Sequence, residues 1–127
     1  MENKLLNIKE FIALRNRYNS ITEEELKEFQ HHRISKMEFL ERMTGFGSNR
    51  ACTLCTATRE KNNGYLSCNL CVWHIYNGDN LIYPCTEHKA EKTYMAIDES
   101  TMIKELHTAY RNRAKLMTKV IKQLKLE

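Results

Sequence analysis

The chain has 127 residues and a net charge of +4, with 42% hydrophobic residues, 28% charged residues and a single proline. This length favours one domain, and the composition excludes an intrinsically disordered or low-complexity protein. No stretch reaches the ~18–20 apolar residues of a membrane span, and the N-terminus lacks the apolar core of a signal peptide, so we expect a cytoplasmic protein without membrane contact.

Helices are predicted in residues 1–44, the first part of this single domain of residues 1–127. The first helix is indicated by apolar residues at helical spacing, namely Leu5, Ile8, Phe11, Ile12 and Leu14. Thr22 and Glu25 have the spacing of a capping box, and Ile21 and Leu26 can form a hydrophobic staple across it. A second helix is therefore expected to begin at Thr22.

A second capping box is predicted at Ser35 and Glu38. We expect the helix that begins at Thr22 to break near residues 32–34 and a short helix to follow; the alternative is one continuous helix. Gly45 and Gly47 then supply the positive φ at which helices commonly end.

The middle part, residues 45–98, carries two signals for β-hairpins. Asn63-Gly64 and Asn77-Gly78 are typical of type I′ turns, because both central residues of such a turn need φ > 0. The second pair lies between two runs of strand-forming residues, 72–76 and 81–83. Two β-hairpins are therefore predicted, and with the flanking helices they indicate an α+β fold.

All five cysteines of the chain lie in this middle part. The pattern is Cys52-x2-Cys55, then Cys68-x2-Cys71, then Cys85-x2-His88. In a reducing compartment, closely spaced cysteines more often bind metal than form disulfides. Two such pairs complete the tetrahedral site of a structural zinc ion, with Zn–S distances of ~2.3 Å.

Cys68 and Cys71 belong to both ways of completing one zinc site. Cys52 and Cys55 are the favoured partners, because two Cys-x2-Cys pairs are a specific zinc signal and the first predicted hairpin has few apolar residues to hold it. The alternative ligands are Cys85 and His88. We predict one structural zinc ion whose coordination leaves no open position for catalysis.

The last part, residues 99–127, reads as a long amphipathic helix. It holds seven Lys and Arg against three Asp and Glu, which accounts for the positive charge of the chain. The basic residues available to a partner are Arg111, Arg113, Lys115, Lys119, Lys122 and Lys125. Its apolar stripe is expected to pack on the N-terminal helices, and a homodimer formed through this helix is the alternative.

A resemblance covers residues 45–127. The run GFGSNRACTLC, residues 45–55, followed by Cys68-Asn69-Leu70-Cys71, Cys85, Tyr94 and the basic helix, resembles small cysteine-rich zinc-binding proteins of bacteria and phages. The resemblance implies zinc and a phage or prophage origin but carries over no active site. It implies a non-catalytic protein that binds a host or defence protein as an inhibitor or adaptor.

Two other functions are weighed against this one. The first is a nucleic-acid-binding zinc protein, with phosphate contacts from the basic helix and base stacking by Tyr65, Trp73 and Tyr76. The second is a metal-dependent nuclease, which would depend on His74 and His88. No phosphate-binding glycine loop, nucleophile elbow or His-Glu-x-x-His motif occurs in the sequence, so binding is favoured over catalysis.

Overall fold

The computed structural model describes residues 5–28, 35–46, 52–65, 67–78 and 84–127. In these residues the secondary structure consists of helices and turns, with no strand. The helices are α1 (Ile8–Ser20), α2 (Glu23–Lys27), α3 (Lys36–Thr44), α4 (Thr53–Lys61), the short 3-10 helix η2 (Cys68–Leu70), α5 (Val72–Asn77), the 3-10 helix η3 (His88–Ala90), α6 (Glu91–Glu99) and α7 (Ile103–Leu124).

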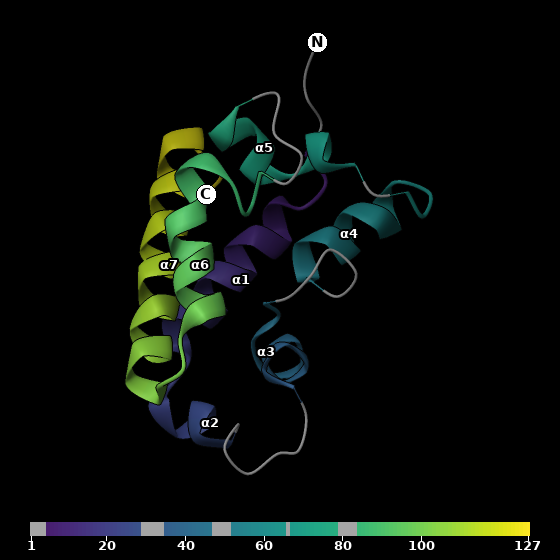
Figure 1. The fold of residues 1–127 in the computed structure, drawn as a ribbon. Helices are drawn as coiled ribbons and strands as arrows, with labels where there is room; N and C mark the ends of the chain where they lie inside the picture. The colour runs from purple at the N-terminus through teal and green to yellow at the C-terminus, as the bar shows by residue number, and fades with distance from the viewer. Residues whose placement is uncertain (1–4, 29–34, 47–51, 66, 79–83) are drawn as a thin grey trace.

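The long helix α7 organises the core. It packs against α1 and α6, and Figure 1 shows α6 and α7 side by side, with α4 at the opposite side of the molecule. The rings of Tyr18 in α1 and Tyr110 in α7 lie 5.1 Å apart between centroids. The apolar stripe of α7 is buried within its own chain, through Leu106, Ala109, Tyr110, Ala114, Met117, Val120 and Ile121. The expected packing on the N-terminal helices is therefore present.

The predicted starts of α2 and α3 are confirmed. Thr22 Oγ1 accepts a hydrogen bond from the Glu25 N–H over 3.2 Å, and the Glu25 carboxylate accepts one from the Thr22 N–H over 3.3 Å. Ser35 Oγ accepts from the Glu38 N–H in the same way. Gly45 ends α3 with φ 80°. The break predicted near residues 32–34, and Gly47, lie outside the described residues.

The prediction of an α+β fold with two hairpins is wrong. Where strands were expected in the described residues, the chain forms α4, η2 and α5. Within α5 the buried residues are Val72, Trp73, Tyr76 and Asn77, which is the spacing of one helix face. Because strand preference mostly reflects how side chains pack, burial of this face in the core overrides it. Residues 81–83 lie outside the described residues.

The two Asn-Gly pairs end helices instead of turning hairpins. Asn63 and Gly64 do have the predicted positive φ, 55° and 87°. They follow α4, however, and the Gly64 N–H donates back to the Arg59 carbonyl over 2.8 Å. Gly78, with φ 92°, follows α5. A residue with positive φ is equally suited to the end of a helix, so the dipeptide alone does not distinguish the two structures.

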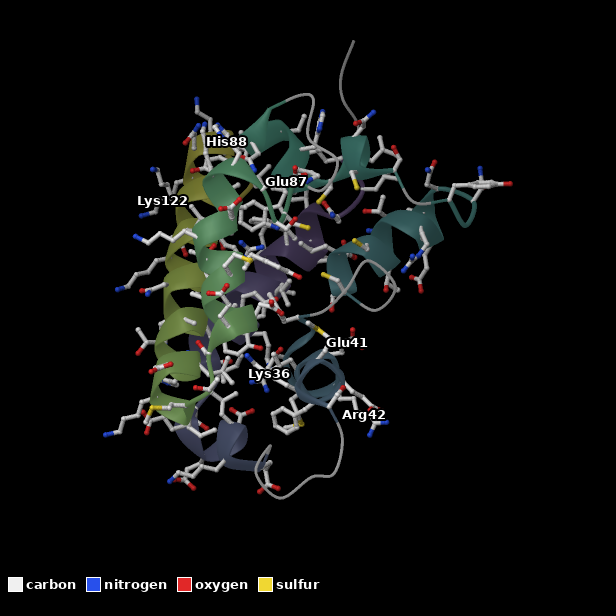
Figure 2. All side chains as sticks on the ribbon, viewed as in Figure 1. Lys36, Glu41, Arg42, Glu87, His88 and Lys122 are labelled. Atoms are coloured by element: carbon white, nitrogen blue, oxygen red, sulfur yellow. The ribbon has the colours of Figure 1, made fainter. Side chains whose placement is uncertain are left out.

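The sequence patterns also do not predict α6, and α7 begins at Ile103 rather than near residue 100. Lys36 joins α3 to the end of α6, because its ammonium donates to the carbonyls of Ile97, Asp98 and Ser100 over 2.8, 2.6 and 2.5 Å. Figure 2 shows its place between the two helices. The last carbonyls of a helix lack intrahelical donors, so this ammonium satisfies them. None of the helices described is both long enough and apolar enough to cross a membrane.

Candidate metal centre

Four cysteines line one small internal cavity of about 30 Å³: Cys52, Cys55, Cys71 and Cys85. The first two belong to the N-terminus of α4, the third precedes α5, and the fourth lies in the turn before η3. The other walls are Leu14, Tyr18, Phe46, Leu54, Trp73, Tyr94, Arg113 and Met117. A single water needs ~10–15 Å³ of such space, so the cavity has room for one ion. All five cysteines of the chain are free thiols.

Cys52 is held in a setting that favours its thiolate. The Cys55 thiol and the backbone N–H groups of Leu54 and Cys55 lie near Cys52 and favour its charged form. With the help of the positive charge of Arg113, they lower the pKa of Cys52 to about 6, against the opposing effect of burial. The neighbouring Cys52, together with burial, raises the pKa of Cys55.

Cys71 has donors from two sides. The side-chain amide of Asn7, which is fully buried, donates to Cys71 Sγ over 3.1 Å, and the Trp73 backbone N–H also reaches this sulfur. Burial outweighs these donors and raises the pKa of Cys71 to about 11. Asn7 Oδ1 in turn accepts from the Val72 N–H over 3.0 Å, so the start of α1 is tied to the start of α5.

Cys52 and Cys71 therefore occupy equivalent positions. Each is the N-cap residue of a helix, α4 and α5 respectively, and neither side chain makes a capping hydrogen bond to its helix. The thiolate is the form of cysteine that binds metal, and the positive end of a helix favours it. The two helix starts place Cys52 and Cys71 at the wall of the cavity.

The set of cysteines around the cavity differs by one residue from the set favoured by spacing. Cys85 lines the cavity, where burial raises its pKa to about 12, whereas Cys68, on η2, does not line it. Neither of the histidines considered lines it: His88 lies exposed on η3, as Figure 2 shows, and His74 lies on α5.

Within the described residues, no three His, Cys, Asp or Glu side chains already stand in the arrangement of a metal site. Ligation of one ion by Cys52, Cys55, Cys71 and Cys85 would therefore require these side chains to move from the positions that they have in this structure.

Arg113 forms the charged wall of the cavity. Its side chain is 4% exposed, and its guanidinium stacks over the Trp73 ring at 4.3 Å. It donates to the carbonyls of Cys85 and Ala90 over 2.8 and 3.0 Å and to Thr93 Oγ1 over 2.8 Å. None of the ion pairs among the described residues includes it. It was predicted as a partner-binding residue, and instead it lies in the core.

The remaining predicted partner-binding residues lie on the outside of α7 or at its end. Lys115, Lys119, Lys122 and Lys125 are exposed, and none of them forms an ion pair with a described residue. Figure 2 shows Lys122 pointing away from the bundle. Arg111 is partly buried, and its guanidinium donates to the Tyr18 carbonyl over 2.7 Å.

Two residues beside the cysteines, Arg113 and Asn7, were missed when the sequence was interpreted. Arg113 follows Tyr110 by three residues and precedes Met117 by four, which places it inside the apolar stripe of α7. That spacing was sufficient to predict its burial. Asn7 is close to cysteines only through tertiary contacts 47 to 65 residues away in sequence, so no local pattern indicates it. Of the aromatic residues considered for stacking on bases, Trp73 and Tyr76 are buried and Tyr65 is exposed.

Comparison of the chain with protein-family models, with curated proteins and with solved structures finds no match. The interpretation of the site therefore depends on the chemistry of its residues alone.

Proposed function

We propose that this chain is a non-catalytic binding protein whose interior is organised by one structural zinc ion. The observation that supports the proposal is the position of Cys52, Cys55, Cys71 and Cys85 around one ion-sized cavity. Four thiolates in tetrahedral arrangement are a common ligand set of structural zinc. A reducing cytoplasm is part of the proposal, since it keeps the five cysteines as thiols.

A structural role suits this site better than a catalytic one. A cavity of about 30 Å³ holds an ion but no substrate, and four protein ligands leave no coordination position for water. Structural zinc supplies ~10–16 kcal/mol of apparent binding free energy, which is comparable to or larger than the whole stability of a small domain. The ion would thus hold α4, α5 and the segment before η3 together.

Nucleic acid is the partner class that the described surface supports best. Lys115, Lys119 and Lys122 follow one another at helical spacing on the exposed side of α7 and line an open hollow there with Thr118 and Gln123. Residues 106–126 contain no Asp or Glu. Lysines without a carboxylate neighbour are available to phosphate groups.

A host or defence protein, the partner implied by the resemblance, is the alternative. Protein interfaces commonly have an apolar centre. The exposed large hydrophobic side chains of the described residues are Tyr65, Met95 and Met102. Tyr65 follows α4, whereas Met95 and Met102 lie on and after α6, at the other side of the molecule in Figure 1. They do not form one patch.

Two measurements test the proposal. Native mass spectrometry of the purified chain should show one zinc ion per subunit, and it reports the subunit number in the same spectrum. Fluorescence anisotropy with labelled duplex and single-stranded oligonucleotides should show binding that weakens steeply between about 50 and 200 mM salt. A chain without metal overturns the zinc centre. If the chain does not bind the oligonucleotides but binds a protein at high salt, a protein partner is supported instead of nucleic acid.

A further inference from the structure

Among the described residues, the core holds one buried positive charge, that of Arg113, and no buried Asp or Glu. Arg113 is 4% exposed, and an arginine keeps its charge at all ordinary pH values. Burial of an unpaired charge is strongly unfavourable, so buried arginines are normally paired with a carboxylate. Here the hydrogen-bond acceptors of the guanidinium are two backbone carbonyls and one hydroxyl, all neutral.

The described residues that line the cavity with Arg113 include no Asp or Glu. Their ionisable groups are the thiols of Cys52, Cys55, Cys71 and Cys85 and the phenols of Tyr18 and Tyr94. Because tyrosine phenols are neutral near pH 7, the cysteines are the source of negative charge among these described lining residues.

A metal ion converts these thiols into the missing negative charge. Each thiol loses its proton when it binds a metal, and a divalent ion held by four thiolates keeps a surplus of negative charge. We propose that Arg113 is the fixed counter-charge of a four-thiolate metal centre, placed by the fold to offset that surplus and to increase the affinity for the ion. The inference rests on the zinc centre proposed above.

The contacts of Arg113 fit this role. Its guanidinium donates to the Cys85 carbonyl, so the charge is fixed to the backbone of a ligand residue. The Trp73 ring covers the guanidinium at 4.3 Å and excludes water from one face. Low local polarity strengthens the interaction between the guanidinium and nearby thiolates. Arg113 thus acts on the ligands through its charge and is not itself a ligand.

The experiment compares the zinc affinity of three variants by competition with a chromogenic chelator. Arg113→Lys keeps the charge but loses the fork of hydrogen bonds, whereas Arg113→Gln keeps part of the hydrogen bonding and loses the charge. We expect Arg113→Gln to lower the affinity about 10–100-fold, as is typical when a residue behind the ligands is removed, and Arg113→Lys to stay near wild type. Arg111→Gln, which removes one charge from the same helix outside the cavity, should bind zinc as the wild type does.

The outcomes separate the two proposals. If the wild-type chain binds no zinc, both the zinc centre and the counter-charge are overturned. A wild-type chain that holds one zinc ion, with Arg113→Gln and Arg113→Lys weakened equally, overturns the counter-charge and leaves the zinc centre intact, because the hydrogen bonds alone would then matter. If Arg113→Gln yields no folded protein even with zinc, the zinc affinity of Arg113→Lys decides. An affinity equal to that of the wild type supports the counter-charge. A loss of affinity as large as that caused by a ligand substitution overturns it.

A second readout is the cobalt form. The thiolate-to-cobalt absorption of the wild type reports four sulfur ligands, and we expect it to be unchanged in intensity in Arg113→Gln once cobalt is saturating. Loss of the counter-charge alone should leave the four sulfur ligands in place and lower only the affinity for the metal. A lower intensity at saturation would show that Arg113 acts by holding the ligand segment in place and would overturn the proposal.

Discussion

The side-chain amide of Asn7 donates to Cys71 Sγ over 3.1 Å, and its oxygen accepts from the Val72 N–H over 3.0 Å. One buried residue at the start of α1 thus holds both the sulfur and the helix start that carries it. This contact spans 64 residues of sequence and connects the N-terminal helices to the cysteine segments.

Substitution of Asn7 should therefore damage the fold and the metal centre together. Asn7→Asp keeps the acceptor for the Val72 N–H but replaces the donor to Cys71 with a buried carboxylate, which would repel the thiolate. We expect a loss of about 1–3 kcal/mol in the free energy of unfolding, measured with urea, and weaker zinc retention against a chelator. Asn16→Asp, in the exposed part of α1, is the matched control and should be near neutral. Equal zinc retention in both variants would contradict this role of Asn7.

Single Cys→Ser substitutions distinguish the ligand set at the cavity from the set favoured by spacing. We expect the variants at Cys52, Cys55, Cys71 and Cys85 to lose zinc, because each removes one ligand, and their thermal unfolding should move to clearly lower temperature. Cys68→Ser should keep one zinc ion. The measurement is metal content by native mass spectrometry with a parallel unfolding curve. Zinc loss from Cys68→Ser, with Cys85→Ser unaffected, would instead support the original two Cys-x2-Cys pairs.

The helix caps show what the sequence predicts reliably in this chain. Thr22, Ser35 and Gly45 were each assigned correctly, because a cap depends on backbone groups within a few residues. The Asn63-Gly64 pair also has the predicted φ signs, yet the elements around it were assigned wrongly. Local conformation was accessible from the sequence, whereas the choice between helix and strand on either side depended on burial in a core formed by distant segments.

The cavity lined by cysteines shows the same limit. Three of the four cysteines at the cavity belong to the set chosen from spacing, but spacing cannot tell which cysteine of the later segments reaches the cavity. Arg113 was placed with the exposed basic residues because of its charge, although its place in the apolar stripe of α7 indicated burial. Where charge and periodicity disagreed, periodicity was the better guide to the burial of Arg113.

The capping box of α2 gives a pH-dependent contribution to stability. Glu25 accepts from Arg17 over 2.6 Å and from the Thr22 N–H, and these contacts lower its pKa below the usual value. A carboxylate whose pKa is lower in the folded state stabilises the fold at neutral pH, and this contribution is lost as pH falls through the folded pKa, below about 4.5. We expect Glu25→Gln to cost about 1 kcal/mol at pH 7 in urea unfolding, and the difference from wild type to shrink near pH 3. A difference that stays constant with pH would contradict this account.

Lys36 connects α3 to the end of α6 through hydrogen bonds. Its ammonium donates to three carbonyls at the end of α6, so Lys36→Met leaves these carbonyls without a donor while keeping most of the aliphatic stem. We expect a loss of about 1–3 kcal/mol in the free energy of unfolding. Zinc content should stay unchanged, because Lys36 does not line the cavity. Lys104→Met, on an exposed position of α7, is the control and should have little effect. A Lys36→Met variant as stable as this control would show that water satisfies the carbonyls equally well.

Substitution of the exposed lysines of α7 tests whether the partner is a nucleic acid. Lys115, Lys119 and Lys122 span about 10 Å along one side of the helix, and no described carboxylate pairs with them. The triple Lys→Gln variant should bind duplex and single-stranded oligonucleotides more weakly, with the slope of log affinity against log salt smaller by about 2–3, close to one unit for each phosphate that a lysine no longer neutralises. Because the three side chains are exposed, stability and zinc content should not change.

The matched control removes the same amount of charge elsewhere. Lys9, Lys27 and Lys92 are exposed on α1, α2 and α6, so their triple Lys→Gln variant has the same net charge as the α7 variant. If affinity depends on net charge alone, the two variants will weaken equally and the face of α7 has no special role. If α7 binds the phosphates, only its own variant will change the slope, because only lysines at the interface release counterions on binding.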